Sequence, residues 1–592
     1  MPTADMIDGK IVVSTEYRDK EAIKQVPGMT WDGTGQWRGP LAWATCKALR
    51  GIFGDRLTVG ESLAAWAWEE KAKRIDPSMA MRESLEAEGD DRLFPPQRAG
   101  VAWLQATKRG LLGDPMGSGK TRQLLLAIPD DGWPAIVIAP NGVRGSWRKE
   151  VEAINLDCEV KILDGTAPQR RKALEGINDG DRTLVVVNWE ALRSLSRLAP
   201  YGSVRLNKCI ACGGIDENVT DAKCESHVKP LNEIPWRTVI RDEAHRAKDP
   251  RSKQTRASWA LQHAPTVRYC WDATGTPVAQ NVADLWTIMH GNSPEDFPTK
   301  TKFLDRYAVT SWGVYGGMEI AGLNPLHSDE LFEFLDPRFR HVPKEALLPF
   351  LPPKVREERV CKMNPKQAKA YKEMATEMIA ALEDGTVVTT NPLAQYTRLI
   401  QFSSAYAQMN DDGEVSLSDP SCKVDELMEI LGDLGETEPV VVGMVSRQLL
   451  ELCEARLDKA NISYSSVKGG QSLEDREDAI DDFQSGKVRV ILLTVQSGGV
   501  GITLTRAQYL VMLQRSWSLV DNMQTEDRVH RIGSEQHTQV TIIDVVTEKT
   551  IEVGRQLERL QEKGANLNEI LRDAESLKRL AFGEEVPNVT GK

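Results

Sequence analysis

An apolar run turns into a glycine-rich loop at Leu111-Leu112-Gly113-Asp114-Pro115-Met116-Gly117-Ser118-Gly119-Lys120-Thr121, and a second apolar stretch follows it. This order predicts a strand, a loop and the start of a helix. Gly117 and Gly119 allow the backbone N–H groups to point at a phosphate, and the helix N-terminus adds partial positive charge. Lys120 would bind the β- and γ-phosphates, and the Thr121 hydroxyl would bind Mg²⁺. The strict phosphate-loop pattern has Gly where this chain has Asp114, so the loop is a variant, and an ordinary Gly-rich turn is the alternative.

Two adjacent carboxylates end a later apolar run, Val239-Ile240-Arg241-Asp242-Glu243-Ala244-His245. Asp242 would hold Mg²⁺ through water, and Glu243 would polarise an attacking water. A solvated acidic turn is the alternative. A phosphate loop followed by a strand that ends in Asp-Glu instead favours a nucleoside triphosphatase.

The composition is that of a globular protein with several domains. The chain has 592 residues, of which 41% are hydrophobic and 27% are charged. This length predicts about three or four domains. No apolar run approaches the ~20 residues that a membrane helix needs, and residues 1–10 lack the pattern of a secretory signal. The nine cysteines, an odd number, argue against a disulfide framework. We therefore expect a cytoplasmic protein that does not bind membranes.

Apolar runs alternate with helical patterns on both sides of a central irregular stretch, which predicts two parallel sheets covered on both faces. The strands expected in the first array are 111–112, 135–138, 160–163, 184–187, 239–242 and 267–271. Those expected in the second array are 440–442, 462–464, 488–494, 509–513 and 540–545. Polar residues follow the C-terminal ends of the first set, where such sheets bind ligands. The second array has no phosphate loop, so we interpret it as a partner for the first.

Two segments outside these arrays suggest binding roles. Gln97 follows Pro95-Pro96 on the first turn of an expected helix, where its amide could read an adenine edge; the alternative is a surface glutamine. Residues 1–90 are rich in tryptophan, which indicates either a small core or a base-stacking accessory surface.

A cysteine-rich insertion has the spacing of a metal site. Cys209 and Cys212 are followed after a short interval by Cys224 and His227, and a Cys₃His set suits tetrahedral zinc. All four ligand positions are filled, so the expected role is structural. Reduced surface thiols on a loop are the alternative reading.

Two further motifs lie in the second array of strands and helices. Gly498-Gly499-Val500-Gly501 is a second glycine-rich turn. If residues 524–531 are helical, Gln524, Arg528 and Arg531 share one face, and the two guanidiniums suit a γ-phosphate as an arginine finger. A solvated basic helix is the alternative.

In this order the motifs resemble those of superfamily-2 helicase-like ATPases of the Snf2 type, over residues 93 to about 560. Asp242-Glu-Ala-His245 resembles the family's DEAH-type motif II, and Thr274-Gly-Thr-Pro277 resembles motif III. Arg340-His-Val-Pro-Lys344 and Leu351-Pro-Pro-Lys354 resemble the linker into the second lobe. Gly498-Gly499-Val500-Gly501 resembles motif V. The chain departs from the family pattern at Pro115, Ser118, Thr503, Ser516–Leu519 and Thr525, and the changes near motif V put the coupling between DNA and ATP in question.

The resemblance implies an α/β fold with two RecA-like lobes, helical insertions, a small zinc-binding insertion and a small N-terminal α+β accessory domain. The expected domains are the accessory domain 1–90, lobe 1 at 91–285 with the zinc insertion 205–230, a helical insertion and linker at 286–420, lobe 2 at 421–560, and a C-terminal helix and tail at 561–592. The residues expected to contact ATP are Gln97, Asp114, Met116, Gly117, Ser118, Gly119, Lys120, Thr121, Gly501 and Gln524. Those expected to act in hydrolysis are Lys120, Asp242, Glu243, Arg528 and Arg531.

The function implied is a DNA-dependent ATPase that moves along double-stranded or branched DNA, with ATP, Mg²⁺ and Zn²⁺ bound. We expect a monomer, a bacterial or phage-infected cell as its setting, and replication or recombination proteins as partners. The net charge of −12 argues against a nucleic-acid partner, but a local groove of basic residues decides phosphate binding. A strand-separating DNA or RNA helicase and a nucleotide-gated DNA clamp with little turnover are the alternatives. In a third view, the zinc loop and residues 1–90 supply specificity and the motor serves them.

Overall fold

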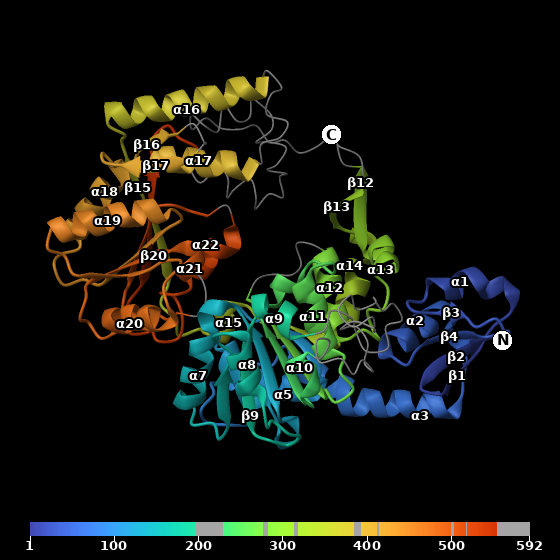
Figure 1. The fold of residues 1–592 in the computed structure, drawn as a ribbon. Coiled ribbons are helices and arrows are strands. Elements are labelled where there is room, and N and C mark those ends of the chain that lie inside the picture. Colours follow the sequence, from blue (N-terminus) through green and yellow to red (C-terminus); the bar gives the residue numbers. More distant parts are fainter. Residues whose placement is uncertain are drawn as a thin grey trace. The chain divides into compact units, whose positions relative to one another are not determined.

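The computed structural model of the chain describes residues 1–196, 229–275, 282–312, 318–383, 392–410, 414–498, 502–516 and 518–552. The chain divides into two compact units, Met1–Pro349 and Phe350–Lys592 (Figure 1). The division lies inside the stretch 286–420 that the sequence presents as one insertion and linker. No helix among the described residues is long and apolar enough to cross a membrane.

A seven-stranded parallel sheet forms the centre of the first unit, in the order β14-β6-β11-β10-β7-β9-β8. Its strands are β6 (Arg109–Leu112), β7 (Ala135–Ala139), β8 (Glu159–Ile162), β9 (Thr183–Asn188), β10 (Thr238–Asp242), β11 (Tyr269–Ala273) and β14 (Phe339–Arg340). The inner strands are buried on both faces, which explains their nearly continuous apolar sequences. The parallel sheet predicted from the alternating pattern is confirmed.

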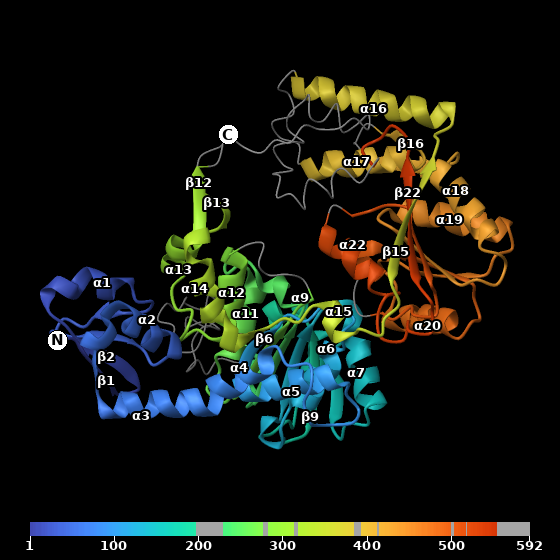
Figure 2. The same ribbon diagram turned by 180° about the vertical axis from the view of Figure 1, so that it is seen from behind.

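Helices cover both faces of this sheet, as right-handed crossovers require. The helices are α5 (Pro95–Thr107), α6 (Lys120–Ala127), α7 (Arg144–Ala153), α8 (Ala167–Leu174), α9 (Trp189–Leu195), α10 (Pro230–Glu233), α11 (Lys253–Gln262) and α12 (Val282–Asn292). Helices α8 to α11 lie over the face seen in Figure 1, and α5 to α7 lie over the face seen in Figure 2. After α12 come α13 (Lys300–Tyr307), the hairpin β12 (Ala308–Trp312) and β13 (Met318–Leu323), α14 (Ser328–Leu335) and, beyond β14, α15 (Lys344–Leu347).

The N-terminal residues form a separate five-stranded sheet in the order β3-β4-β2-β1-β5. Its strands are β1 (Thr3–Ile7), β2 (Lys10–Ser14), β3 (Thr30–Trp31), β4 (Trp37–Pro40) and β5 (Thr58–Val59), and its helices are α1 (Lys20–Gln25) and α2 (Trp43–Phe53). Trp37 and Trp66 pack in its small apolar core, whereas Trp31 and Trp68 are exposed. Two tryptophans of residues 1–90 therefore belong to a small core, which was one of the two interpretations of this segment, and two others are at the surface.

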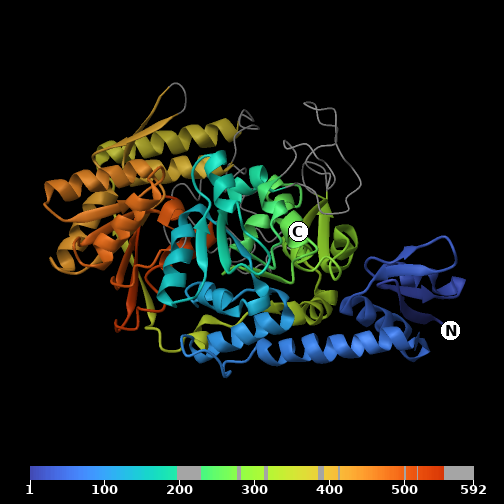
Figure 3. The ribbon, with the colours of Figure 1, turned by 60° about the horizontal axis from the view of Figure 1, so that its bottom comes forward.

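A helical run leads from this sheet into the rest of the first unit (Figure 3). It consists of α3 (Glu61–Glu70), a wider turn at Lys71–Ile75 and α4 (Asp76–Arg82). The Asp5 carboxylate in β1 accepts the Leu63 N–H at 2.9 Å and so satisfies one of the unpaired donors in the first turn of α3. Arg82 ends the run, and residues 83–92 form no helix or strand.

The second unit contains a six-stranded parallel sheet in the order β15-β22-β21-β18-β20-β19. Its strands are β15 (Lys354–Cys361), β18 (Val440–Met444), β19 (Tyr464–Val467), β20 (Val490–Thr494), β21 (Tyr509–Met512) and β22 (Val540–Thr547). The other elements are α16 (Pro365–Glu383), α17 (Pro392–Ser404), the hairpin β16 (Tyr406–Met409) and β17 (Val415–Ser418), α18 (Cys422–Asp433), α19 (Arg447–Lys459), α20 (Leu473–Gln484), α21 (Val495–Gly498) and α22 (Leu519–Glu526). The sequence did not indicate β15, because this edge strand is charged rather than apolar.

Candidate active site

The phosphate loop connects β6 to α6, as its sequence predicts. Gly117 and Gly119 have φ of +76° and +78°, which places both in the left-handed region that favours glycine. Lys120 is the first residue of α6 and Thr121 is the second. The Lys120 ammonium donates to the main-chain oxygens of Asp114 at 2.7 Å and Pro115 at 2.9 Å, so the lysine folds back across its own loop.

Gln97 is buried beside this loop, at the N-terminus of α5. Its amide oxygen accepts the Phe94 N–H at 3.1 Å, and its amide nitrogen donates to the main-chain oxygen of Ser118 at 2.9 Å. Gln97 therefore ties the start of α5 to the loop. The structure thus places Gln97 next to the loop residue Ser118 and gives each end of its amide a protein partner, while its contact with adenine stays a prediction.

The two motif II carboxylates end β10. The Asp242 carboxylate accepts the Glu243 N–H at 3.0 Å and the Trp147 indole N–H at 3.3 Å. Burial, together with the neighbouring Glu243 carboxylate, raises the pKa of Asp242 to about 6, although Lys120 opposes the shift. Glu243 follows the end of β10 with a left-handed backbone, φ of +50°, which is uncommon for a residue other than glycine.

Two residues without a predicted role, Trp189 and His245, contact Asp242 and Glu243. The Trp189 indole donates to the main-chain oxygen of Asp242 at 3.0 Å. His245 Nδ1 lies 3.3 Å from a Glu243 carboxylate oxygen and 3.2 Å from the Thr274 hydroxyl. Because Thr274 belongs to motif III, His245 connects motifs II and III. The indication of this role in the sequence was the position of Trp189 directly after an apolar strand that ends at Asn188.

Motif III contacts the phosphate loop through Gly275. A Cβ atom built on Gly275 would lie 2.3 Å from Met116 Cγ and 3.2 Å from the Lys120 ammonium. Only glycine therefore fits this approach. The first unit thus brings together the predicted residues of the loop, motif II and motif III at the C-terminal ends of β6, β10 and β11, where parallel sheets bind ligands.

A buried ion pair lies directly beneath the carboxylates. Arg241 donates to both oxygens of Asp272, at 2.7 and 2.6 Å, and both side chains are completely buried. Arg241 also donates to the Ser258 hydroxyl and the Ile288 carbonyl, at 3.2 and 3.1 Å. The pair joins adjacent strands, because Arg241 is in register with Asp272.

Arg528 and Arg531, which the sequence predicts as an arginine finger, lie in the second unit, and the helical face predicted for them is wrong. Helix α22 ends at Glu526, so Gln524, Arg528 and Arg531 do not share a helical face. The chain leaves the helix because the Arg528 carbonyl accepts the Leu504 N–H at 3.0 Å, which draws the backbone toward the motif V segment. The two guanidiniums nevertheless meet, since both donate to the Ile502 carbonyl, at 3.4 and 3.1 Å.

Glu526, at the end of α22, is the centre of a buried charge cluster. It pairs with Lys354 at 3.3 Å, Arg356 at 2.6 Å and Arg515 at 2.9 Å. Burial acts to raise the pKa of Glu526, but the three cations outweigh it and lower the pKa to about 2. Asp544 on β22 also pairs with Arg515, so the cluster fixes the helix end against the sheet.

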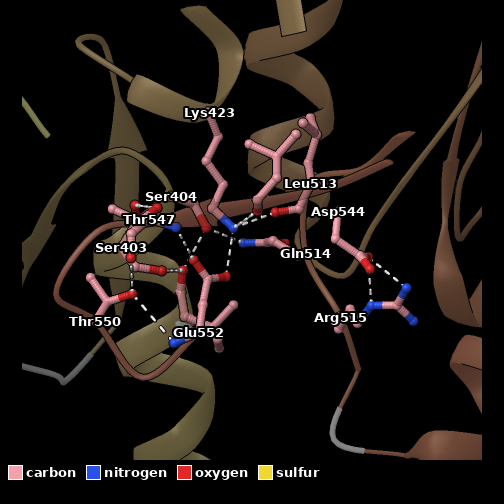
Figure 4. Close-up of polar contacts among 12 residues, drawn as sticks. Ser403, Ser404, Lys423, Leu513, Gln514, Arg515, Asp544, Thr547, Thr550 and Glu552 are labelled. Carbon is pink, nitrogen blue, oxygen red and sulfur yellow. Dashed lines mark hydrogen bonds and ion pairs between the residues drawn. The ribbon is translucent and has the colours of Figure 1, made fainter. Parts of the chain in front are cut away.

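A completely buried lysine, Lys423, lies in the same unit (Figure 4). This lysine, on α18, donates to the carbonyl oxygens of Leu513, which follows β21, and of Val545 in β22, and to the Glu552 carboxylate at 2.5 Å. Gln514 accepts the Val445 and Ser446 N–H groups at 3.0 and 2.7 Å. These contacts fix the segment between β21 and α22.

The chemistry of the first-unit residues fits a nucleotide with Mg²⁺. A carboxylate at Asp242 and a hydroxyl at Thr121 are hard oxygen ligands of the kind Mg²⁺ prefers. Burial and, after it, repulsion from Glu243 raise the pKa of Asp242, and a bound cation would favour the charged carboxylate against both. Gly501 and the four predicted zinc ligands, Cys209, Cys212, Cys224 and His227, lie outside the described residues.

Comparison with known proteins gives two adjoining family matches. The SNF2-related domain matches residues 96–412, which is more than half of the chain, and the helicase conserved C-terminal domain matches residues 422–533. Together they cover every motif described above from Gln97 to Arg531.

Individual relatives show the same affiliation at low identity. The ISWI chromatin-remodeling complex ATPase ISW1 of Saccharomyces cerevisiae is 27% identical over 499 residues, which is 80% of this chain and 40% of the relative. The putative ATP-dependent helicase/translocase YwqA of Bacillus subtilis is 24% identical over 475 residues, which is 78% of this chain and 47% of the relative. The chain thus spans less than half the length of these two proteins. Among solved structures, the Sulfolobus solfataricus SWI2/SNF2 ATPase core in complex with dsDNA matches with 21% identity and a TM-score of 0.36, over 85% of this chain and 99% of that chain.

Proposed function

Because the chain belongs to the SNF2-related family of helicase-like ATPases, we propose that it hydrolyses ATP to move along double-stranded DNA and to remodel DNA or protein–DNA complexes. The observation that carries the proposal is the pair of adjoining family matches, one in each half of the chain, together with the placement of Lys120 close enough to Asp242 for its charge to lower the pKa of that carboxylate. Relatives whose names include chromatin-remodeling ATPase and helicase/translocase support the DNA substrate.

Each site residue has a proposed role in hydrolysis. Lys120 binds the β- and γ-phosphates, and Glu243 orients the attacking water. Thr121 and Asp242 hold Mg²⁺, which when bound neutralises charge on the phosphates. Arg528 and Arg531 stabilise the charge that develops on the γ-phosphate, and Gln97 contacts the adenine.

The test is ATP hydrolysis by the purified chain without nucleic acid and with single-stranded, duplex or forked DNA or RNA, beside Lys120→Ala. Strong stimulation by duplex or forked DNA, lost in Lys120→Ala, is the expected result. Stimulation only by RNA or single strands would instead indicate a conventional helicase. An absence of turnover with every substrate would indicate a nucleotide-gated clamp, and equal rates in Lys120→Ala and wild type would refute the site.

The cysteine-rich insertion and residues 1–90 have proposed roles of their own. We propose that Cys209, Cys212, Cys224 and His227 bind a structural Zn²⁺, which elemental analysis of wild type and Cys212→Ser would test at one zinc per chain. We also propose that residues 1–90 assist the motor in choosing its DNA, with the exposed Trp31 ring as one contact. Trp31→Ala should weaken binding to duplex or forked DNA without changing the ATPase rate at saturating DNA.

A further inference from the structure

Arg340 lies beside the phosphate loop although it follows that loop by more than two hundred residues. It ends β14, the edge strand that pairs with β6, and it is in register with Leu112. Its carbonyl accepts the Gly113 N–H at 2.7 Å. The backbone of Arg340 therefore holds the first residue of the loop, and its side chain lies under the loop, completely buried.

The Arg340 guanidinium holds the junction between two helices. It donates to the carbonyls of Met81 and Arg82 at the C-terminal end of α4, to that of Ser84 at 3.1 Å and to that of Pro96 in the first turn of α5 at 3.3 Å. The first two acceptors are at a helix C-terminus, where carbonyls lack helical partners and the dipole favours a cation. One planar side chain thus fixes where α4 stops.

The same guanidinium faces the loop carboxylate. Its Nε lies 3.7 Å from Asp114 Oδ2, and both side chains are completely buried. The other Asp114 oxygen accepts the Val342 N–H at 3.2 Å, and the Asp114 carbonyl accepts the Lys120 ammonium at 2.7 Å. Burial raises the pKa of Asp114, whereas the Arg340 and Lys120 charges lower it. One residue, Asp114, therefore separates Arg340 from the phosphate-binding lysine.

We propose that Arg340 is a positioning residue for ATP hydrolysis, which holds the phosphate loop through Asp114 and couples it to the helical run Glu61–Arg82. This inference rests on the proposed assignment of the loop as the ATP site. Arg340 does not touch the nucleotide. It sets the position of Asp114, and hence of the carbonyl that holds Lys120, according to where α4 ends.

The helical run is fixed at both of its ends, so a displacement at one end reaches the other. At the sheet end, the Asp5 carboxylate accepts from the first turn of α3. At the loop end, Arg82 donates to the Phe339 carbonyl at 3.2 Å and pairs with Asp336 at 2.8 Å. A ligand that moves the N-terminal sheet would therefore act on nucleotide affinity through Arg340.

The decisive variant is Arg340→Lys, which keeps a positive charge but cannot reach several carbonyls and Asp114 together. The matched control is Arg338→Lys, two residues earlier in the chain, where a similarly buried arginine pairs with Asp296 away from the loop. Each full-length variant is measured for its thermal midpoint, for the dissociation constant of fluorescent mant-ADP, and for KM and kcat in DNA-stimulated ATP hydrolysis. A further variant is Arg82→Ala, at a partly exposed position. It removes side-chain contacts between α4 and the β14 segment, and it leaves the Arg340 side chain in the protein.

We expect Arg340→Lys to weaken mant-ADP binding and to raise the KM for ATP by about five- to tenfold, and Arg82→Ala to shift both in the same direction by less. Arg338→Lys should lower the thermal midpoint to a similar degree and leave nucleotide affinity within about twofold of wild type. Equal nucleotide affinities in Arg340→Lys and Arg338→Lys would overturn the inference. If Arg340→Lys does not yield folded protein, Arg82→Ala decides alone, and an unchanged mant-ADP affinity contradicts the coupling. A failure of the site assignment is separate, since it would appear as undiminished turnover in Lys120→Ala.

Discussion

Arg241 and Asp272 face each other on adjacent strands, are joined by two hydrogen bonds and are completely buried. Arg241 directly precedes Asp242, and Asp272 directly precedes Ala273. The pair lies directly behind the carboxylates that the proposed mechanism uses. It is therefore placed to keep β10 and β11 in register under the site.

Removal of one partner of this pair should destabilise the first unit strongly. Arg241→Met leaves Asp272 as an uncompensated buried charge, and we expect a loss of about 3–5 kcal/mol in the free energy of unfolding. Arg241→Met combined with Asp272→Leu should recover most of the loss, because neither charge is then buried. Urea denaturation measures both, and Arg268→Met, which removes an exposed pair with Asp131, is the control and should cost less than about 1 kcal/mol. A double variant no more stable than Arg241→Met would contradict the expectation.

Asp242→Asn should abolish ATP hydrolysis and yet stabilise the protein at neutral pH. The pKa of Asp242 is raised from 3.8 to about 6, so the folded state binds more protons than the unfolded state between these values, and stability falls as pH rises through that window. At pH 7 the carboxylate therefore costs up to about 3 kcal/mol, and the uncharged Asn side chain removes this cost. Thermal midpoints of wild type and variant, compared at pH 4.5 and 7.5, measure the difference, which should be larger at the higher pH.

The activity of the wild-type protein should show the same ionisation. Asp242 must be a carboxylate to hold Mg²⁺, so turnover should fall as pH decreases through about 6. Higher Mg²⁺ should move this acid limb to lower pH, because the cation favours the charged form. An acid limb that is independent of Mg²⁺ would assign the titration to another group.

Gln97→Ala should impair nucleotide binding in two separable ways. The substitution removes the hydrogen bonds to Phe94 and Ser118, so the loop loses a support and the KM for every nucleotide should rise about three- to tenfold. If Gln97 also reads adenine, the preference for ATP over GTP should fall in the variant. Steady-state kinetics with both nucleotides decides this, and an unchanged ATP/GTP ratio would reduce Gln97 to a support of the loop.

Glu552→Gln should destabilise the second unit, because it leaves the buried Lys423 ammonium without its anion. We expect a loss of about 3–5 kcal/mol. Glu548→Gln, four residues earlier, is the matched control, since its pairing with Lys362 spans 3.9 Å at an exposed position and should contribute less than about 1 kcal/mol. Chemical denaturation of the full chain, followed by circular dichroism, compares the two. Equal losses would show that the Lys423 contacts to main-chain carbonyls are sufficient without Glu552.

Local patterns predicted the parts of the fold that depend on neighbouring residues. The strand, loop and helix around Lys120 and the strand that ends at Asp242 follow from apolar runs, glycine placement and spacing. Their meeting at one edge of the sheet follows from the rule that parallel strands expose their C-terminal ends together.

Contacts set by register between distant strands could not be predicted in this way. The pairing of Arg241 with Asp272, and of β14 with β6, depends on which strands are neighbours, which no local pattern encodes. The predicted helical face of Arg528 and Arg531 was wrong for the same reason. The turn after Glu526 is stabilised by a hydrogen bond to Leu504, whose position a helical periodicity cannot include.

The pairing of β15 with β22 runs in parallel register along eight residues, from Lys354 to Cys361. This strand pairing determines where a fragment that contains only the second unit should begin. A fragment that begins at residue 422, where the family match begins, would leave β22 with a bare apolar edge and invite aggregation through that edge. The fragment should begin before Lys354, so that its charged strand protects the sheet.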